Sequence, residues 1–568
     1  MSRKNDIFVS QNITLNNSYT DMKIVTSLFF MLFVLLCNVS AQNPYLPLWE
    51  FIPDGEPYVF EDPDNPGKYR VYIYGSHDML RKYYCGRDQV VWSASVGDLA
   101  HWRCDGIIFR LDKDRDGNLI NANGDGDVLY APDVCETTDS TGRKVYYLYP
   151  NVQSDERGSA VAKSYRPDGP FEVCNWSKDN PRRTVGPISF DPAAFVDDDG
   201  RAYAYWGFTR SMAAELDPAT MSTVKPGTKV IDNMITSFKD SVNMVYRFFE
   251  ASSIRKIKDK YVFIYSRWTN EGEDGLPQTN YTLAYCYSNS PLGPWTYGGT
   301  IIDGRGKERQ PDGSVKATAT PGGNTHGSLC CINGKWWVFY HRQAGTSEYS
   351  RQAMVAPVEV EVREGEGGYV RISEAEYTSE GFKTEGLDPL TEYQAGIACY
   401  YTGPHGARQE FPNMIYSGSH TEVHYLEEYP GYSYDKAAEI TNPYAAEINR
   451  CPMVNNVDGS VVGYKYYNFS KTYGKKKLRL QLNYEPEGID GTVDIYIDRP
   501  SEQEGGVRIG SLTVKGSGAK AVEPVRASVD VSSLSHYNGK HALYLVFSSK
   551  TKGKSVCRLN TLRFSSAD

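Results

Sequence analysis

The chain has 568 residues, of which 40% are hydrophobic and 23% are charged, and its formal net charge is −9. This length predicts two or three domains, and the composition excludes a largely disordered protein. An acidic chain without a sustained basic run argues against a nucleic-acid partner. The sequence also contains 43 Tyr and 9 Trp, which suit strand-rich folds and sugar-facing surfaces alike.

The first 41 residues have the pattern of an export signal. Met22 and Lys23 precede the apolar run from Ile24 to Cys37, and Val39-Ser40-Ala41 ends the segment like a signal-peptidase site. The run is shorter than the roughly 20 residues needed to span a bilayer. We therefore expect an exported protein, periplasmic or extracellular, without a membrane span. Lipidation of Cys37 is the alternative, and it would anchor the protein to a membrane.

Five copies of a hairpin pattern follow, each with two β-prone segments joined by a turn rich in Asp, Asn, Gly or Lys. Their spacing is close to the length of a propeller blade, and no long helical periodicity separates them. The pattern predicts a five-bladed β-propeller over residues 42–365, with a large hairpin-rich sandwich as the alternative. The second segments of the five hairpins comprise residues 69–74, 145–149, 202–206, 261–265 and 336–340.

One titratable residue precedes the first strand segment of each hairpin. In a propeller the equivalent strand starts surround one axis, so we expect these side chains to converge on one mouth of the channel. Clustered carboxylates repel one another, which favours a function over the alternative of turn or cap residues. Glycosidic bond hydrolysis needs such a set, with one carboxylic acid for the leaving oxygen and one carboxylate for water or carbon. The five residues are Asp54, Asp133, Asp191, Glu250 and His326.

The motifs around these residues resemble glycoside hydrolase family 43 as a set, in order, over roughly residues 43–365. The resemblance implies an inverting mechanism on arabinosyl, xylosyl or related sugars. It is carried by Asp54-Gly-Glu-Pro57, Ala131-Pro-Asp133, Asp191-Pro192 with Val196-Asp-Asp-Asp-Gly200, Glu250-Ala-Ser-Ser253 and Thr325-His-Gly-Ser328.

The same resemblance implies a role for each carboxylate. Asp54 would be the general base, Glu250 the general acid, and Asp191 would orient Glu250 and raise its pKa by repulsion. Gly55-Glu56 separates Asp54 from Pro57 and Ala251 replaces a common Gly, so Glu56 or Asp62 is the alternative base. The candidate substrate-binding residues are His326, Asp133 and Arg342, and a structural role is the alternative for His326.

A possible cation loop lies between the first and second hairpins. Asp112, Asp114 and Asp116, followed by Gly117, have the D-x-D-x-D-G spacing of a calcium loop, but position twelve is Asn123 instead of Glu. The loop therefore predicts either a structural calcium ion or a solvated acidic turn. The hydrolytic chemistry itself requires no cofactor.

The last third of the chain has a different pattern. Residues 366–395 are expected to form a connector, and residues 396–568 contain short strands with Gly- and Ser-rich turns, which predicts a β-sandwich. Three segments resemble carbohydrate-binding module family 6 jelly rolls, which implies a sugar-binding module, with a purely structural module as the alternative. These segments are 493–498, 509–512 and 541–547.

The sequence thus predicts an all-β protein made of a propeller followed by a jelly-roll sandwich. Its predicted function is that of an exported, exo-acting α-L-arabinofuranosidase acting by inversion on plant-type polysaccharide or oligosaccharide. A β-xylosidase or β-galactofuranosidase using the same carboxylates is the close alternative. A non-catalytic glycan-binding propeller is the alternative from another class, but a lectin has no need of a repelling carboxylate triad.

Overall fold

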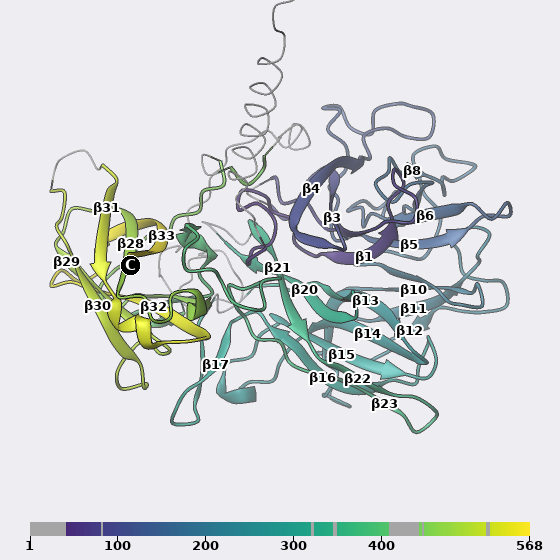
Figure 1. Cartoon of the computed structure of the whole chain (residues 1–568). Coiled ribbons are helices and arrows are strands. Elements are labelled where there is room, and N and C mark those ends of the chain that lie inside the picture. The colour runs from purple at the N-terminus through teal and green to yellow at the C-terminus, as the bar shows by residue number, and fades with distance from the viewer. Residues whose placement is uncertain are drawn as a thin grey trace, which may run out of the picture.

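The computed structural model describes residues 41–80, 83–319, 323–344, 349–407, 442–445, 448–518 and 523–567. The predicted signal segment lies outside these residues except for Ala41. The described chain is built from strands and a few short 3-10 turns (Figure 1). No helix among these residues is long and apolar enough to cross a membrane.

Five antiparallel sheets of consecutive strands follow one another along the chain and confirm the five-bladed propeller. The first four blades have four strands each, and the described part of the fifth has three. Blade 1 contains β1 (Glu56–Glu61), β2 (Tyr69–Tyr74), β3 (Gln89–Ser95) and β4 (Asp98–Phe109); blade 2 contains β5 (Asp133–Thr138), β6 (Lys144–Tyr149), β7 (Ala162–Ser164) and β8 (Glu172–Val173). Blade 3 contains β9 (Ala193–Val196), β10 (Ala202–Trp206), β11 (Met212–Leu216) and β12 (Ile231–Asp232); blade 4 contains β13 (Phe248–Ile257), β14 (Lys260–Arg267), β15 (Thr282–Ser288) and β16 (Thr296–Asp303); blade 5 contains β19 (Ser328–Ile332), β20 (Lys335–Gln343) and β21 (Arg351–Val358).

The sequence pattern of the inner strands follows from the way blades stack. Every residue of β10 and of β14 is buried, because both faces of a blade pack against its neighbours. The predicted hairpin turns are also present. Asn333 and Gly334, with φ of 51° and 80°, connect β19 to β20, and this left-handed conformation suits an Asn-Gly pair in a tight turn.

The ring is closed by the start of the described chain and by the connector. The Asn43 side chain donates to Val355 O (2.7 Å) and accepts from Val355 N (2.9 Å), which ties the N-terminal segment to β21. The connector in turn packs on this segment, since Asn43 N donates to Ser379 O (3.0 Å). The short hairpin of β22 (Val360–Arg363) and β23 (Tyr369–Ile372) leads from blade 5 into the connector. The N-terminal segment, blade 5 and the connector therefore form one packed unit.

Two sheets form the C-terminal sandwich, as predicted. The four-stranded sheet has the order β24-β33-β28-β31, and the six-stranded sheet the order β26-β25-β27-β32-β29-β30. The sandwich begins at β24, three residues before the predicted boundary. The strands are β24 (Tyr393–Gln394), β25 (Tyr400–Gly403), β26 (Gly406–Ala407), β27 (Val461–Asn468), β28 (Lys477–Pro486), β29 (Gly491–Ile497), β30 (Val507–Val514), β31 (Val525–Asp530), β32 (Lys540–Ser548) and β33 (Cys557–Ala567).

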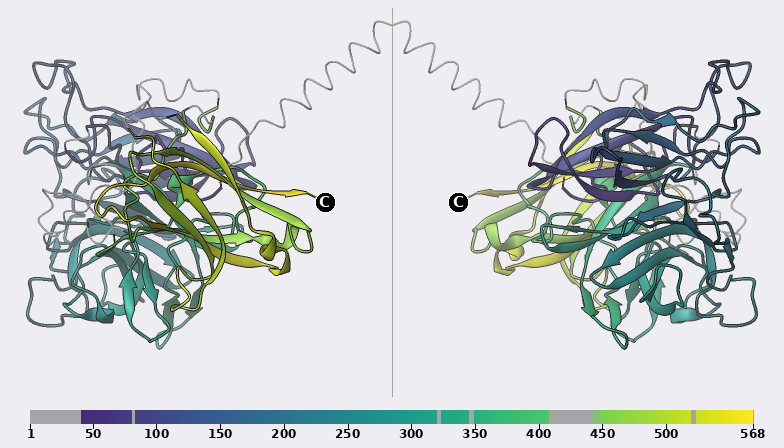
Figure 2. Two further views of the ribbon diagram at one scale, coloured as in Figure 1. Left: turned by 90° about the vertical axis from the view of Figure 1, so that its left-hand side faces the viewer. Right: turned by 90° about the vertical axis from the view of Figure 1, so that its right-hand side faces the viewer.

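The sandwich packs on the propeller through the hairpin of β17 (Lys307–Arg309) and β18 (Val315–Ala317). Figure 2 (left) shows the yellow sandwich strands in front of the propeller. Glu308 of the hairpin pairs with Lys465 (2.8 Å) and Arg499 (2.6 Å) of the sandwich. Lys316 of the hairpin lies over the Tyr400 ring, 5.3 Å from its centre. The hairpin thus covers the outer face of the six-stranded sheet at Tyr400. The sugar-binding role of the C-terminal module stays a prediction.

Candidate active site

A cavity of about 370 Å³ opens at one mouth of the propeller. Four of the five predicted titratable residues line it: Asp54, Asp191, Glu250 and His326. Asp54, Asp191 and His326 each stand two residues before the first strand of their blade, and Glu250 lies in β13 where the pairing with β14 is irregular. These four side chains therefore converge on one mouth of the propeller, as the repeats predict.

The backbone around these carboxylates is held in an uncommon conformation. Asp54, Asp191 and Ala251 have φ of 60°, 47° and 67°, in the left-handed region that residues other than glycine seldom adopt. Such strain tends to gather at functional sites, where the surrounding fold imposes it. The departure from the family pattern at Ala251 thus falls on a position where glycine would be unstrained.

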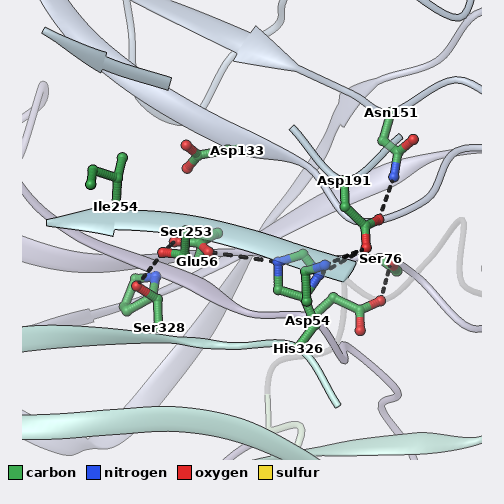
Figure 3. Close-up of polar contacts among 12 residues, drawn as sticks. Asp54, Glu56, Ser76, Asp133, Asn151, Asp191, Ser253, Ile254, His326 and Ser328 are labelled. Carbon is green, nitrogen blue, oxygen red and sulfur yellow. Dashed lines mark hydrogen bonds and ion pairs between the residues drawn. The ribbon is translucent and has the colours of Figure 1, made fainter. Parts of the chain in front are cut away.

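Asp133 and Arg342 lie outside the cavity. Asp133 is fully buried, and it accepts hydrogen bonds from the Tyr58 hydroxyl and from Ala194 N, both at 2.7 Å. Ala131 lines the cavity instead, and Figure 3 shows Asp133 apart from Asp54 and Asp191. Asp133 and Asp191 have the same spacing in sequence to the turns of their hairpins. This spacing determines where a residue lies along its hairpin, but not how deep its side chain lies along the propeller axis.

Arg342 points toward the sandwich. Its guanidinium donates to Gly396 O (2.6 Å) and Ala398 O (2.8 Å), so it joins blade 5 to the start of the C-terminal domain. Neither Arg342 nor Asp133 therefore lines the cavity in which the sugar is predicted to bind. The arginine that does line the cavity is Arg351 at the start of β21, and no motif in the sequence marks it.

Asp54 is held as a carboxylate. Its Oδ2 accepts a 2.5 Å hydrogen bond from Ser76 Oγ, and Arg351 Nη1 lies 3.0 Å from Oδ1. Burial alone would raise the pKa of Asp54, but the Arg351 charge and the other neighbours outweigh burial and lower it. Burial lowers the pKa of His341 to about 3, so this ring is neutral and its Nδ1 accepts from Asp54 N at 3.3 Å. Asp54 can thus act as a base.

Glu250 has the opposite electrostatic environment. Burial, followed by the negative charge of Asp191, raises its pKa well above the usual range. Asp191 is fixed by Asn151 Nδ2 (2.9 Å) and by the N–H of Ala251 (3.0 Å). Burial raises the pKa of Asp191 to about 6 although the nearby His326 opposes this shift. Glu250 therefore keeps its proton near neutral pH and can act as an acid.

His326 lies between the cavity and a deeper polar layer. Its Nδ1 is 3.8 Å from Asp191 Oδ2 and its Nε2 is 3.8 Å from Glu56 Oε1 (Figure 3). Burial would lower the pKa of His326, but the three nearby carboxylates raise it to about 9. The ring therefore carries a positive charge that balances part of the carboxylate cluster.

The alternative bases named from the sequence are occupied elsewhere. Glu56 lies below the cavity, where Arg255 Nη2 is 2.8 Å from Oε2. Asp62 follows the last residue of β1 and accepts from Asp64 N at 3.0 Å, as a turn residue does. Asp54 is thus the aspartate that is placed to serve as the base.

The loop with calcium-like spacing bonds to itself. Asp114 Oδ1 accepts the N–H groups of Asp116 (3.0 Å) and Asn118 (2.9 Å), while Asp116 pairs with Arg115 (3.0 Å). In the part of the chain that the structure describes, no group of three or more His, Cys, Asp or Glu side chains is placed to hold a metal ion. These contacts form the solvated turn named as the alternative, and calcium binding by Asp112, Asp114 and Asp116 stays a prediction.

Comparisons with known proteins show what the chain is similar to. The family model "Glycosyl hydrolases family 43" matches residues 60–362. The chain is 33% identical over 472 residues to a xylosidase/arabinosidase of Thermoclostridium stercorarium, covering 79% of this chain and 86% of the relative. It is 21% identical over 532 residues to an arabinoxylan arabinofuranohydrolase of Paenibacillus polymyxa, covering 91% and 72%. A solved family 43 arabinoxylan arabinofuranohydrolase of Bacillus subtilis has a TM-score of 0.43 at 19% identity, covering 93% of this chain and 98% of that one.

Proposed function

The chain belongs to glycosyl hydrolases family 43, and from this premise we propose that it is an exported, exo-acting α-L-arabinofuranosidase. Its substrates are plant-type polysaccharides or oligosaccharides. The observation that carries the proposal is the pairing of Asp54, whose pKa is lowered, with Glu250, whose pKa is raised, on one cavity. An acid and a base with separated pKa values are what hydrolysis of a glycosidic bond requires.

The proposed reaction proceeds in one displacement. Asp54 accepts a proton from a water molecule as the water oxygen attacks the anomeric carbon. The bond from that carbon to the leaving oxygen breaks, and Glu250 donates its proton to this oxygen. Attack from the side opposite the leaving group inverts the anomeric centre. Asp191 takes no proton in this step; it keeps the pKa of Glu250 high.

The relatives support a pentose as the sugar. They carry the names xylosidase/arabinosidase and arabinoxylan arabinofuranohydrolase, which makes a β-xylosidase the second candidate. The two activities use the same carboxylates and differ in the shape of the sugar that the cavity accepts.

A panel of 4-nitrophenyl glycosides tests the proposal. We expect hydrolysis of the α-L-arabinofuranoside, with the β-D-xylopyranoside cut more slowly. The control for contaminating activity is the Asp54→Asn variant, which lacks the base whatever the leaving group. Proton NMR of the first sugar released should show the inverted anomer. Turnover of the xyloside alone would replace the proposal by a β-xylosidase, and a retained anomer would contradict the mechanism.

A further inference from the structure

A row of aromatic rings in mutual contact begins at the wall of the cavity. We use the name aromatic strip for Phe190, Phe208, Phe249, Phe238 and Trp268. Neighbouring ring centres are 5.1 Å apart for Phe190 and Phe208 and 5.3 Å apart for Phe208 and Phe249. Beyond Phe249 the rings of Phe238 and Trp268 stack at 4.9 Å with 15° between their planes. Phe208 lines the cavity and is still 51% exposed, so this ring presents a bare aromatic face at the rim. Phe249 and Trp268 are only 5% and 8% exposed and lie behind it in the strip.

The strip lies on the side of the general acid. Phe249 directly precedes Glu250 in β13, and Thr209 N donates a 2.6 Å hydrogen bond to Phe249 O, which fixes the Phe208 segment to this strand. The base has other neighbours, because Asp54 contacts Ser76 and Arg351. The acid must contact the leaving oxygen, and in an inverting reaction the water enters from the other side. A leaving group that departs past Glu250 therefore passes over the exposed ring of the strip, Phe208.

The chemistry of the strip indicates what it binds. Three of its rings, those of Phe190, Phe208 and Phe249, line the cavity. An exposed apolar surface that continues a cavity marks a ligand-binding site more often than plain surface. A pyranose ring with equatorial substituents presents a flat face of C–H groups, which packs on an aromatic ring. A charged sugar would gain nothing from such a surface.

We propose that the aromatic strip, with Phe208 at its centre, is the subsite for the leaving group and binds the face of a neutral pyranose unit of the oligosaccharide that is released. The inference rests on the proposed function, because it takes Glu250 as the acid. It adds a specificity-determining residue that no motif contains. Phe208 would favour substrates whose arabinose is attached to a sugar chain over substrates with a small leaving group.

The test compares two substrates that differ only beyond the leaving oxygen. One is an arabinofuranosylated xylo-oligosaccharide, and the other is methyl α-L-arabinofuranoside, whose methyl group is too small to cover Phe208. In Phe208→Ala we expect kcat/KM on the oligosaccharide to fall about tenfold, the size of one aromatic contact, and to fall less on the methyl glycoside. Phe208→Trp should restore the preference. The matched control is Tyr473→Ala, which removes a 57% exposed aromatic side chain from the sandwich.

The outcomes separate this inference from the proposed function. An equal fall on both substrates in Phe208→Ala, or no fall on the oligosaccharide, would overturn the strip as a leaving-group subsite. If wild-type protein cuts no arabinoside but does cut β-xylosides, the proposed function fails. The same comparison is then made with xylotriose and methyl β-D-xylopyranoside. A larger fall in kcat/KM on xylotriose than on the methyl xyloside in Phe208→Ala would support the inference, and an equal fall would overturn it. Phe238→Ala provides a second variant on the strip, with the same expected direction.

Discussion

Arg351 Nη1 lies 3.0 Å from Asp54 Oδ1, and the two residues are only 1% and 4% exposed to solvent. The same guanidinium is held on its other side by Asp78, at 2.8 Å from Nε and 2.8 Å from Nη2. A cation fixed between two buried carboxylates cannot move away when the cavity empties. It therefore keeps Asp54 ionised, and the pKa of Asp54 sets the acidic limit of activity.

Removing the hydrogen bond from Ser76 tests this relationship without disturbing the ion pairs. In Ser76→Ala the carboxylate of Asp54 loses one donor, so its pKa should rise and the acidic limb of kcat/KM should move to higher pH by about 0.7 unit, for a bond worth ~1 kcal/mol. The measurement is a pH profile of kcat/KM. The control is Ser211→Ala, since Ser211 is an equally buried serine that bonds to Ile235 O. An unmoved acidic limb in Ser76→Ala would contradict the assignment of Asp54 as base.

Substitution of the acid and of the base should have different effects on different leaving groups. Glu250→Gln cannot protonate the leaving oxygen, so alkyl glycosides should lose most activity, on the order of 100-fold or more. Activated aryl glycosides, whose leaving oxygen needs little protonation, should retain more. Asp54→Asn should abolish turnover of both kinds of substrate, because no group then activates water. If Asp54→Asn spares the activated substrate while Glu250→Gln loses both equally, the two roles are reversed.

The parts of the site that the sequence predicts are those that repeat with the blades. Asp54, Asp191, Glu250 and His326 could be found because each precedes the first strand of a blade or lies near its start, and such positions converge on one axis. Asp133 has the same spacing to its turn but lies deeper, since spacing along a hairpin does not determine depth in the propeller.

The residues that the sequence analysis missed are placed by tertiary packing alone. Ser76 reaches Asp54 from the end of β2, and Arg351 reaches it from blade 5, which is 297 residues away in the chain. Neither lies in a repeated position. The Asp112–Asp116 loop shows why spacing alone does not decide between two roles, because a ligand-like spacing can equally supply acceptors for the loop's own N–H groups, as Asp114 does.

The contact between the two domains should depend strongly on Glu308. Its carboxylate is 9% exposed and pairs with Lys465 and Arg499. Glu308→Gln therefore weakens both pairs, although Lys465 keeps its pair with Glu376 at 3.2 Å. Weakening this partly buried cluster should cost about 2 kcal/mol of the free energy of unfolding. Denaturant unfolding measures the loss. In the control Glu361→Gln, which removes an exposed ion pair with Arg371 at 3.6 Å, the free energy of unfolding should fall by less than ~1 kcal/mol. Equal losses in both variants would contradict a stabilising role of Glu308 between the domains.

Asp191 should act on catalysis through the pKa of Glu250. Its carboxylate is the largest charge that raises this pKa after burial, and Asp191→Asn removes that charge while an amide oxygen can still accept from Ala251 N. The pKa of Glu250 should therefore fall, and because the acid must keep its proton, the alkaline limb of the pH profile should move down by about 1–2 units. The acidic limb should not move up, since Asp54 keeps its bonds to Ser76 and Arg351. The control is Asp199→Asn, an exposed aspartate in the same blade. A lower kcat with both limbs unchanged would show that Asp191 only positions Glu250 and does not tune its pKa.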